Sequence, residues 1–218
     1  METQALPKSN LQKGKAHIRF AFHVLVHPFD GFYDIRHENR GRLIVVWINL
    51  LLVGVSFSFL KQYVGFPFQT NDISLLNSFF DMVVLLVIFF LFCLANWSAT
   101  TLMSGEGRFK DIVKACGYAL TPINILLIPA TLISRVLAVD EGAFYLMLIY
   151  LAVIWFAFLM FVGILTIHNY TALRTVAAFV FTIAAALIII FLSLLVIMIF
   201  TQITGVLSSL YKELSYRT

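Results

Sequence analysis

Five long apolar runs dominate the chain, and polar residues gather between these runs and ahead of the first one. Each run is close to the roughly 20 residues that a helix needs to cross the hydrocarbon core of a bilayer. Inside lipid, backbone polar groups have to be satisfied within their own segment, which favours helices. The pattern therefore predicts an all-α, polytopic membrane protein with five transmembrane helices, over residues 43–60, 82–103, 115–138, 143–167 and 176–200.

The polar segments divide the chain into three parts. We expect residues 1–42 to form a cytoplasmic N-terminal region, residues 43–204 the membrane domain, and residues 205–218 a short extracytoplasmic tail. The segments between the last three runs, residues 134–142 and 168–175, are short. Because short connections favour antiparallel neighbours, the third, fourth and fifth spans are expected to pack up and down in one bundle.

A helical pattern precedes the first span. Residues 15–26 read K-A-H-I-R-F-A-F-H-V-L-V, in which Ile18, Phe22 and Leu25 share one helical face. Pro28 then ends the helix, because proline cannot continue the hydrogen-bond ladder. This cytoplasmic amphipathic helix has two possible positions. It lies either in the membrane interface, where basic helices with Phe and Leu on one face are common, or against the cytoplasmic end of the bundle.

The composition excludes a water-soluble fold. The chain is 61% hydrophobic and only 12% charged, whereas soluble domains are about half apolar and about a quarter charged. The formal net charge of +4 would suit a nucleic-acid partner, but the cations flank the apolar runs and form no basic stripe with interleaved aromatics. Membrane lipid is therefore expected as a partner, and nucleic acid is not.

The distribution of cations predicts the orientation, because cytoplasmic segments carry an excess of Lys and Arg. With the N-terminus in the cytoplasm, eleven of the 15 Lys and Arg residues lie on the cytoplasmic side: Lys8, Lys13, Lys15, Arg19, Arg36, Arg40, Arg42, Arg108, Lys110, Lys114 and Arg174. The other four are Lys61, Arg135, Lys212 and Arg217. We expect a multi-pass protein of the plasma membrane with a cytoplasmic N-terminus and an extracytoplasmic C-terminus.

Unusual polar residues cluster in three segments that this topology places on the cytoplasmic side. These are residues 27–42, residues 105–111 and residues 168–170. We interpret them as one surface that binds a protein partner, with the contacts made by Asp30, Asp34, Arg36, Glu38, Glu106, Arg108, Lys110, Asp111, His168 and Asn169. The other interpretation is hydrated residues next to the membrane with an interfacial aromatic.

A second set of polar residues lies at membrane depth, where polar side chains are costly. Asn96 and Thr100 share a helical face, and Thr121 and Asn124 lie in the third span beside Pro122. Proline tends to kink a helix and frees a carbonyl that a neighbour has to satisfy. Asn96 and Asn124 are expected to meet across the helix pair joined by the G-E-G turn. They form either interhelical hydrogen bonds or a polar path between spans two and three.

The chain contains no motif for catalysis or phosphate binding, such as G-x-S-x-G, H-E-x-x-H or a P-loop. We therefore expect no enzyme activity, no cofactor and no metal site. The G-E-G sequence at residues 105–107 predicts a tight turn in which the glycines adopt unusual backbone angles.

Three segments resemble the Yip domain family, in particular its bacterial members. They are N-W-S-A-T-T-L-M-S-G-E-G-R-F-K-D-I, Y-A-L-T-P-I-N-I-L-L-I-P and H-P-F-D-G-F-Y-D-I-R-H-E, and the resemblance covers roughly residues 27–200. It implies five spans, a cytoplasmic N-terminal region and a non-enzymatic partner protein. Eukaryotic relatives bind prenylated Rab-type GTPases, but their D-L-[YW]-G-P motif is absent here, so GTPase binding is not expected.

Two functional hypotheses follow. In the first, the chain is an accessory subunit that docks a membrane complex, such as the subunits of a sugar ABC importer, through its cytoplasmic face. In the second, it transports or handles a small molecule or a lipid along the polar path between spans two and three.

Overall fold

The computed structural model describes residues 10–69 and 76–217, and all regular structure in these residues is helical. The helices are α1 (Asn10–Val26), α2 (Pro28–His37), α3 (Leu43–Tyr63), η1 (Phe66–Phe68), α4 (Ser78–Leu102), α5 (Phe109–Ala119), α6 (Thr121–Ser134), η3 (Val139–Glu141), α7 (Gly142–His168) and α8 (Ala172–Arg217). The predicted all-α fold class is confirmed.

Five helical segments of the described chain are long and apolar enough to cross a membrane, as predicted. They cover Leu43–Tyr63, Ser78–Leu102, Phe109–Ser134, Val139–His168 and Ala172–Glu213. The third begins six residues before the expected residue 115, because F-K-D-I already belongs to α5. The last helix continues through most of the residues assigned to a tail, since no proline interrupts it.

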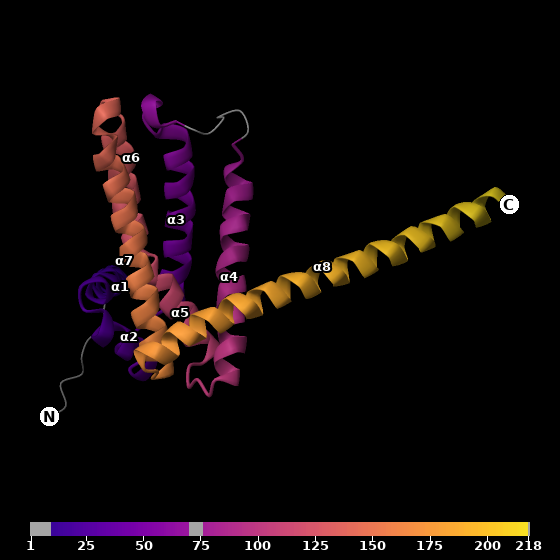
Figure 1. Cartoon of the computed structure of the whole chain (residues 1–218), viewed down its shortest axis with the longest axis horizontal. Helices are drawn as coiled ribbons and strands as arrows, with labels where there is room; N and C mark the ends of the chain where they lie inside the picture. The colour runs from indigo at the N-terminus through magenta and orange to yellow at the C-terminus, as the bar shows by residue number, and fades with distance from the viewer. Residues whose placement is uncertain (1–9, 70–75, 218) are drawn as a thin grey trace.

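The first four spans form a bundle, and α8 leaves it (Figure 1). In Figure 1, α3, α4, α6 and α7 run side by side, and α8 extends away from them at a wide angle. Ala178 and Thr182 in the first turns of α8 are buried against α4. From Phe191 onward every described side chain of α8 is exposed. This apolar surface is of the kind that a spanning helix presents to lipid.

The core is centred on α5, whose residues from Asp111 to Ala119 are all buried. This helix packs against α3, α4 and α7. Phe32 and Ile35 of α2 are fully buried in the same core. The helix α2 is therefore part of the folded bundle and packs at one end of it. We call this end of the bundle the α2 end.

The third span consists of α5 and α6, which meet at Leu120. Pro122 has no N–H group, so the carbonyl of Tyr118 loses its helical donor. The Thr121 hydroxyl donates to that carbonyl at 2.7 Å. One residue earlier, the side-chain amide of Asn49 in α3 donates to the carbonyl of Gly117 at 3.0 Å. Two side chains thus satisfy the backbone where the helix changes direction.

The helix α1 covers the predicted residues 15–26 and packs on the bundle through Ala21 and Val24. Two residues of the apolar face predicted from the sequence point away from the bundle: Ile18 is 63% exposed and Phe22 is 51% exposed. Phe20 makes an edge-to-face contact with Tyr118, at 5.6 Å between ring centroids. The helix therefore has two apolar sides, one against the protein and one facing out.

Candidate functional site

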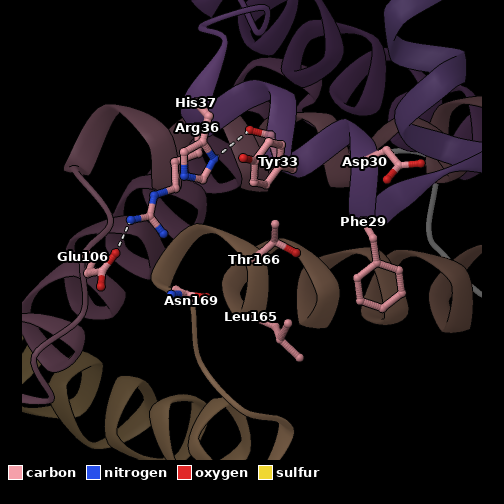
Figure 2. A pocket seen from close by; sticks show the side chains of 9 residues that line it. All are labelled: Phe29, Asp30, Tyr33, Arg36, His37, Glu106, Leu165, Thr166 and Asn169. Atoms are coloured by element: carbon pink, nitrogen blue, oxygen red, sulfur yellow. Dashed lines mark hydrogen bonds and ion pairs between the residues drawn. The ribbon is translucent and has the colours of Figure 1, made fainter.

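Three segments that are far apart in the sequence meet at the α2 end: Pro28–His37, the turn Met103–Arg108, and the junction His168–Thr171 between α7 and α8. An ion pair joins the first two, because the guanidinium of Arg36 contacts the carboxylate of Glu106 (Figure 2). The segments that the sequence analysis grouped as one surface are thus adjacent in the fold.

The turn after α4 is fixed to the end of α7. The Gly107 N–H donates to His168 Nδ1 at 3.3 Å. The Tyr170 hydroxyl lies 3.3 Å from the carbonyl oxygens of Thr100 and Met103, so it bonds the last turn of α4. Burial raises the pKa of the Tyr170 phenol, against a smaller opposing effect of Arg174. The hydroxyl therefore keeps its proton and remains a donor.

The geometry at the end of α7 explains the sequence H-N-Y. Asn169 adopts a left-handed conformation with φ of 54°, which asparagine tolerates better than most residues. The chain then turns back, and the Tyr170 N–H bonds the Leu165 carbonyl at 3.0 Å. This cap brings the Tyr170 ring onto the ring of His168, with 5.3 Å between centroids.

The expected role of the two glycines in the turn is wrong. Neither has a positive φ, and the left-handed residue is Ser104, with φ of 58°. The glycines are required for space. A Cβ on Gly105 would lie 2.5 Å from His168 Nδ1, and a Cβ on Gly107 would lie 2.6 Å from Cγ2 of Ile167.

At the start of α5, an acidic side chain is buried between two cations. Asp111 is only 3% exposed at its side chain; one carboxylate oxygen lies 2.9 Å from Arg108 Nε and the other 3.7 Å from Lys114 Nζ. Arg108 and Lys110 are exposed. Asp111 is therefore a structural carboxylate beneath the surface, where charges are retained only when paired.

The outer side of α2 carries its own charge network. Arg40 Nη1 lies 2.9 Å from Asp34 Oδ2, and Arg40 Nε lies 2.7 Å from Glu38 Oε2. Asp30 is exposed at the start of the helix. His37 stacks on Tyr33, with 4.1 Å between ring centroids.

The predicted contact residues thus divide by exposure. Six are exposed, namely Asp30, Glu38, Glu106, Arg108, Lys110 and Asn169, and two are partly buried, Asp34 and Arg36. Asp111 and His168 are buried. These last two position their neighbours and cannot themselves touch a partner in this conformation.

The polar residues at membrane depth fall into two separate clusters. The Asn96 amide donates to Thr182 of α8 at 3.0 Å, and the Thr100 hydroxyl donates to the Asn96 carbonyl at 2.7 Å. The Asn124 amide donates to the backbone carbonyl of Asn49 at 3.2 Å. The expectation that Asn96 and Asn124 meet is therefore wrong, because α3 provides the partner for one and α8 for the other.

Asn49 is a buried polar residue between helices that the sequence analysis missed. Its amide also lies 3.2 Å from the Thr121 hydroxyl. The sequence could have indicated it, since Asn49 is the one amide side chain within the apolar run 43–60.

A polar cavity of about 430 Å³ lies between α2 and the last turns of α7 (Figure 2). Its walls include Asp30, Tyr33 and Arg36 on one side and Thr166 and Asn169 on the other. Among the residues that the structure describes, no group of three or more His, Cys, Asp or Glu side chains could hold a metal ion.

The helices and this polar end define a multi-pass membrane protein with a folded polar face. The family model of the Yip1 domain matches residues 22–209, and the chain belongs to this family. The resemblance predicted from the sequence is thereby confirmed. The family is not known as enzymatic. No curated protein and no solved structure gave a significant match.

Proposed function

We propose that the protein is a non-enzymatic accessory subunit that docks a complex of the plasma membrane through its α2 end. One observation carries this proposal: three polar segments distant in sequence converge at that end, and an ion pair and a hydrogen bond fix them to one another. A preformed polar surface of this kind suits recognition, because little conformational entropy is lost when a partner binds it.

The charges of this surface favour binding over chemistry. Most of them are paired with one another. Lys110 is exposed, and no ion pair of Lys110 occurs within residues 10–69 and 76–217. It is available to a partner's carboxylate beside the exposed Arg108 and Glu106.

The proposed orientation puts the α2 end in the cytoplasm and the C-terminus outside. It is supported by the excess of Lys and Arg in the segments that meet at this end, as the positive-inside rule requires. A cytoplasmic docking face suits a partner with soluble domains on that side, such as the subunits of an ABC importer.

The test is a charge reversal at Lys110. Tagged full-length protein would be purified from native membranes in mild detergent, and co-eluting proteins would be quantified by mass spectrometry. We expect Lys110→Glu to reduce a stoichiometric membrane partner by about tenfold, the effect of losing one charge-assisted contact and adding a repulsion. Lys212→Glu, the same change at an exposed lysine near the other end of the chain, should have no effect.

A co-elution profile that is identical for Lys110→Glu, Lys212→Glu and the unaltered protein would contradict the docking proposal. Arg108 is less suitable for this test, because its guanidinium holds the buried Asp111 and its reversal would disturb α5.

The alternative is transport or handling of a small molecule or lipid along a path between spans two and three. It has less support, because Asn96 and Asn124 lie in separate hydrogen-bonded clusters. Flux into vesicles reconstituted with the protein would test it. A path through these residues requires Asn96→Leu to abolish flux, and unchanged flux would remove them from the mechanism.

A further inference from the structure

We propose that the edge between α1–α2 and α7 binds one phospholipid with an ethanolamine headgroup. Two adjoining cavities line this edge, one apolar and one polar. The apolar cavity would hold an acyl chain and the polar cavity would hold the headgroup. The polar cavity lies at the α2 end, so the lipid would occupy part of the docking surface proposed above, but its binding does not require the docking partner.

The apolar cavity has a volume of about 420 Å³. It lies between the end of α1 and the middle of α7, and its walls include Leu25, Val26, Pro28, Leu151, Ile154 and Phe158. On the α7 side these residues belong to a spanning segment and are well exposed, so the cavity is continuous with the surface that faces lipid. An acyl chain is the occupant that this position supplies.

The polar cavity follows further along the same two elements (Figure 2). On the α2 side, Pro28 lines the apolar cavity, and the next two residues, Phe29 and Asp30, line the polar cavity. On α7, Phe158 lines the apolar cavity and Leu165 lines the polar cavity. These two lie seven residues apart, which is two helical turns, so they share one face of the helix.

The length of this face fits one leaflet. From Ile154 to Asn169 the helix rises about 22 Å at about 1.5 Å per residue. Half of a bilayer that is about 40–45 Å thick, headgroups included, is about 20–22 Å. A single phospholipid can therefore span from the apolar cavity to the polar one.

The charges of the polar cavity select the headgroup. Two carboxylates, Asp30 and Glu106, and one guanidinium, Arg36, line this cavity, and Arg36 already pairs with Glu106. Asp30 has no ion pair in the described part of the chain. A net acidic cavity disfavours an anionic lipid, whereas the ammonium of a zwitterionic headgroup can donate to the unpaired carboxylate of Asp30.

A buried hydroxyl in the wall adds a further acceptor or donor. Thr166 lines the cavity, and its Oγ1 is buried without a hydrogen-bond partner among the described residues. Buried polar atoms usually have a partner, and a headgroup would supply one. A primary ammonium donates up to three hydrogen bonds, and a choline group donates none, so ethanolamine is the better match.

The position of α1 also supports a lipid site at this edge. Ile18, Phe22 and Val26 are exposed at i, i+4 and i+8 on one side of this helix. Val26 also lines the apolar cavity. The outward side of α1 thus adjoins the lipid site, and lipid in the membrane interface would cover both.

The experiment is native mass spectrometry of the full-length protein. The delipidated protein in mild detergent would be given phosphatidylethanolamine, phosphatidylcholine or phosphatidylglycerol, and retained lipid would be counted at increasing collision energy. We expect one phosphatidylethanolamine per chain, retained about tenfold more than the other two, the effect of one charge-assisted hydrogen bond.

Two variants locate the site. Val26→Trp fills the apolar cavity from an exposed position, so it does not overpack the core. Asp30→Asn removes the carboxylate. Both should lower phosphatidylethanolamine retention about tenfold, and Leu146→Trp, in a neighbouring apolar hollow of α7, should not. Equal retention of the three lipids, or full retention by both Val26→Trp and Asp30→Asn, would overturn the proposal.

Discussion

Asn49 joins α3 to the point where α5 and α6 meet, and its replacement by leucine is the most informative test of the fold. Leucine has a similar volume but no polar atoms. The change removes the hydrogen bonds to Gly117 O and Thr121 Oγ1. It also leaves the Gly117 carbonyl without its side-chain donor at a place where Pro122 has already interrupted the helix.

The magnitude follows from these contacts. Hydrogen bonds between membrane helices average about 0.6 kcal/mol, so the two bonds contribute about 1.2 kcal/mol. An unsatisfied buried carbonyl adds about 1 kcal/mol or more. Asn49→Leu should therefore lower the free energy of unfolding by about 2 kcal/mol, which is about a 30-fold change in the folding equilibrium.

The assay is reversible unfolding in mixed micelles, followed by far-ultraviolet circular dichroism. The control is Ser56→Ala, since Ser56 is buried on the same helix and its hydroxyl has no hydrogen-bond partner in the described residues. That variant should change stability by less than about 0.5 kcal/mol. Equal stabilities of Asn49→Leu and Ser56→Ala would refute the assigned role of Asn49.

Three further predictions concern the α2 end, and the same unfolding assay measures them. Gly107→Ala should destabilise by about 1–3 kcal/mol through crowding, whereas Gly205→Ala, which has open space around it, should be neutral or slightly stabilising; equal effects would show that the turn can relax. Tyr170→Phe should destabilise by about 1 kcal/mol, because it removes the hydrogen bond to the last turn of α4, and an unchanged midpoint would argue against that bond. A double-mutant cycle of Arg36→Ala and Glu106→Ala should give a coupling below about 1 kcal/mol, since Glu106 is 58% exposed at its side chain; a coupling of several kcal/mol would mean that the pair is desolvated.

The five spans could be predicted from the sequence because lipid imposes a simple rule on backbone polar groups. A run such as residues 143–167 contains no charge and has to be helical in a membrane. The proximity of the three polar segments was also predictable, since the alternation of spans puts them on one side. Their contacts were not, because the pairing of Arg36 with Glu106 depends on how α2 packs.

The polar contacts inside the membrane were harder to predict. Spacing along one helix places Asn96 and Thr100 on the same face but does not say which neighbour that face meets. The sequence order suggests α4 beside the third span, and the structure supplies Thr182 of α8 as the partner of Asn96 instead. The glycines of the turn were misjudged for a similar reason, since the rings that exclude a Cβ lie about 60 residues away.

The burial of α5 has a consequence for how the protein is made. The third span is the least apolar of the five and contains Asp111 and Lys114, which are charged in water and poorly accepted by lipid. Both are sheltered by helices on either side of it in the chain, α3 before and α7 after. A nascent chain that ends after residue 134 therefore lacks α7, and its third segment should partition poorly from the translocon. We therefore expect this segment to insert more stably once the fourth span has been made, through cooperation among the helices that cover it.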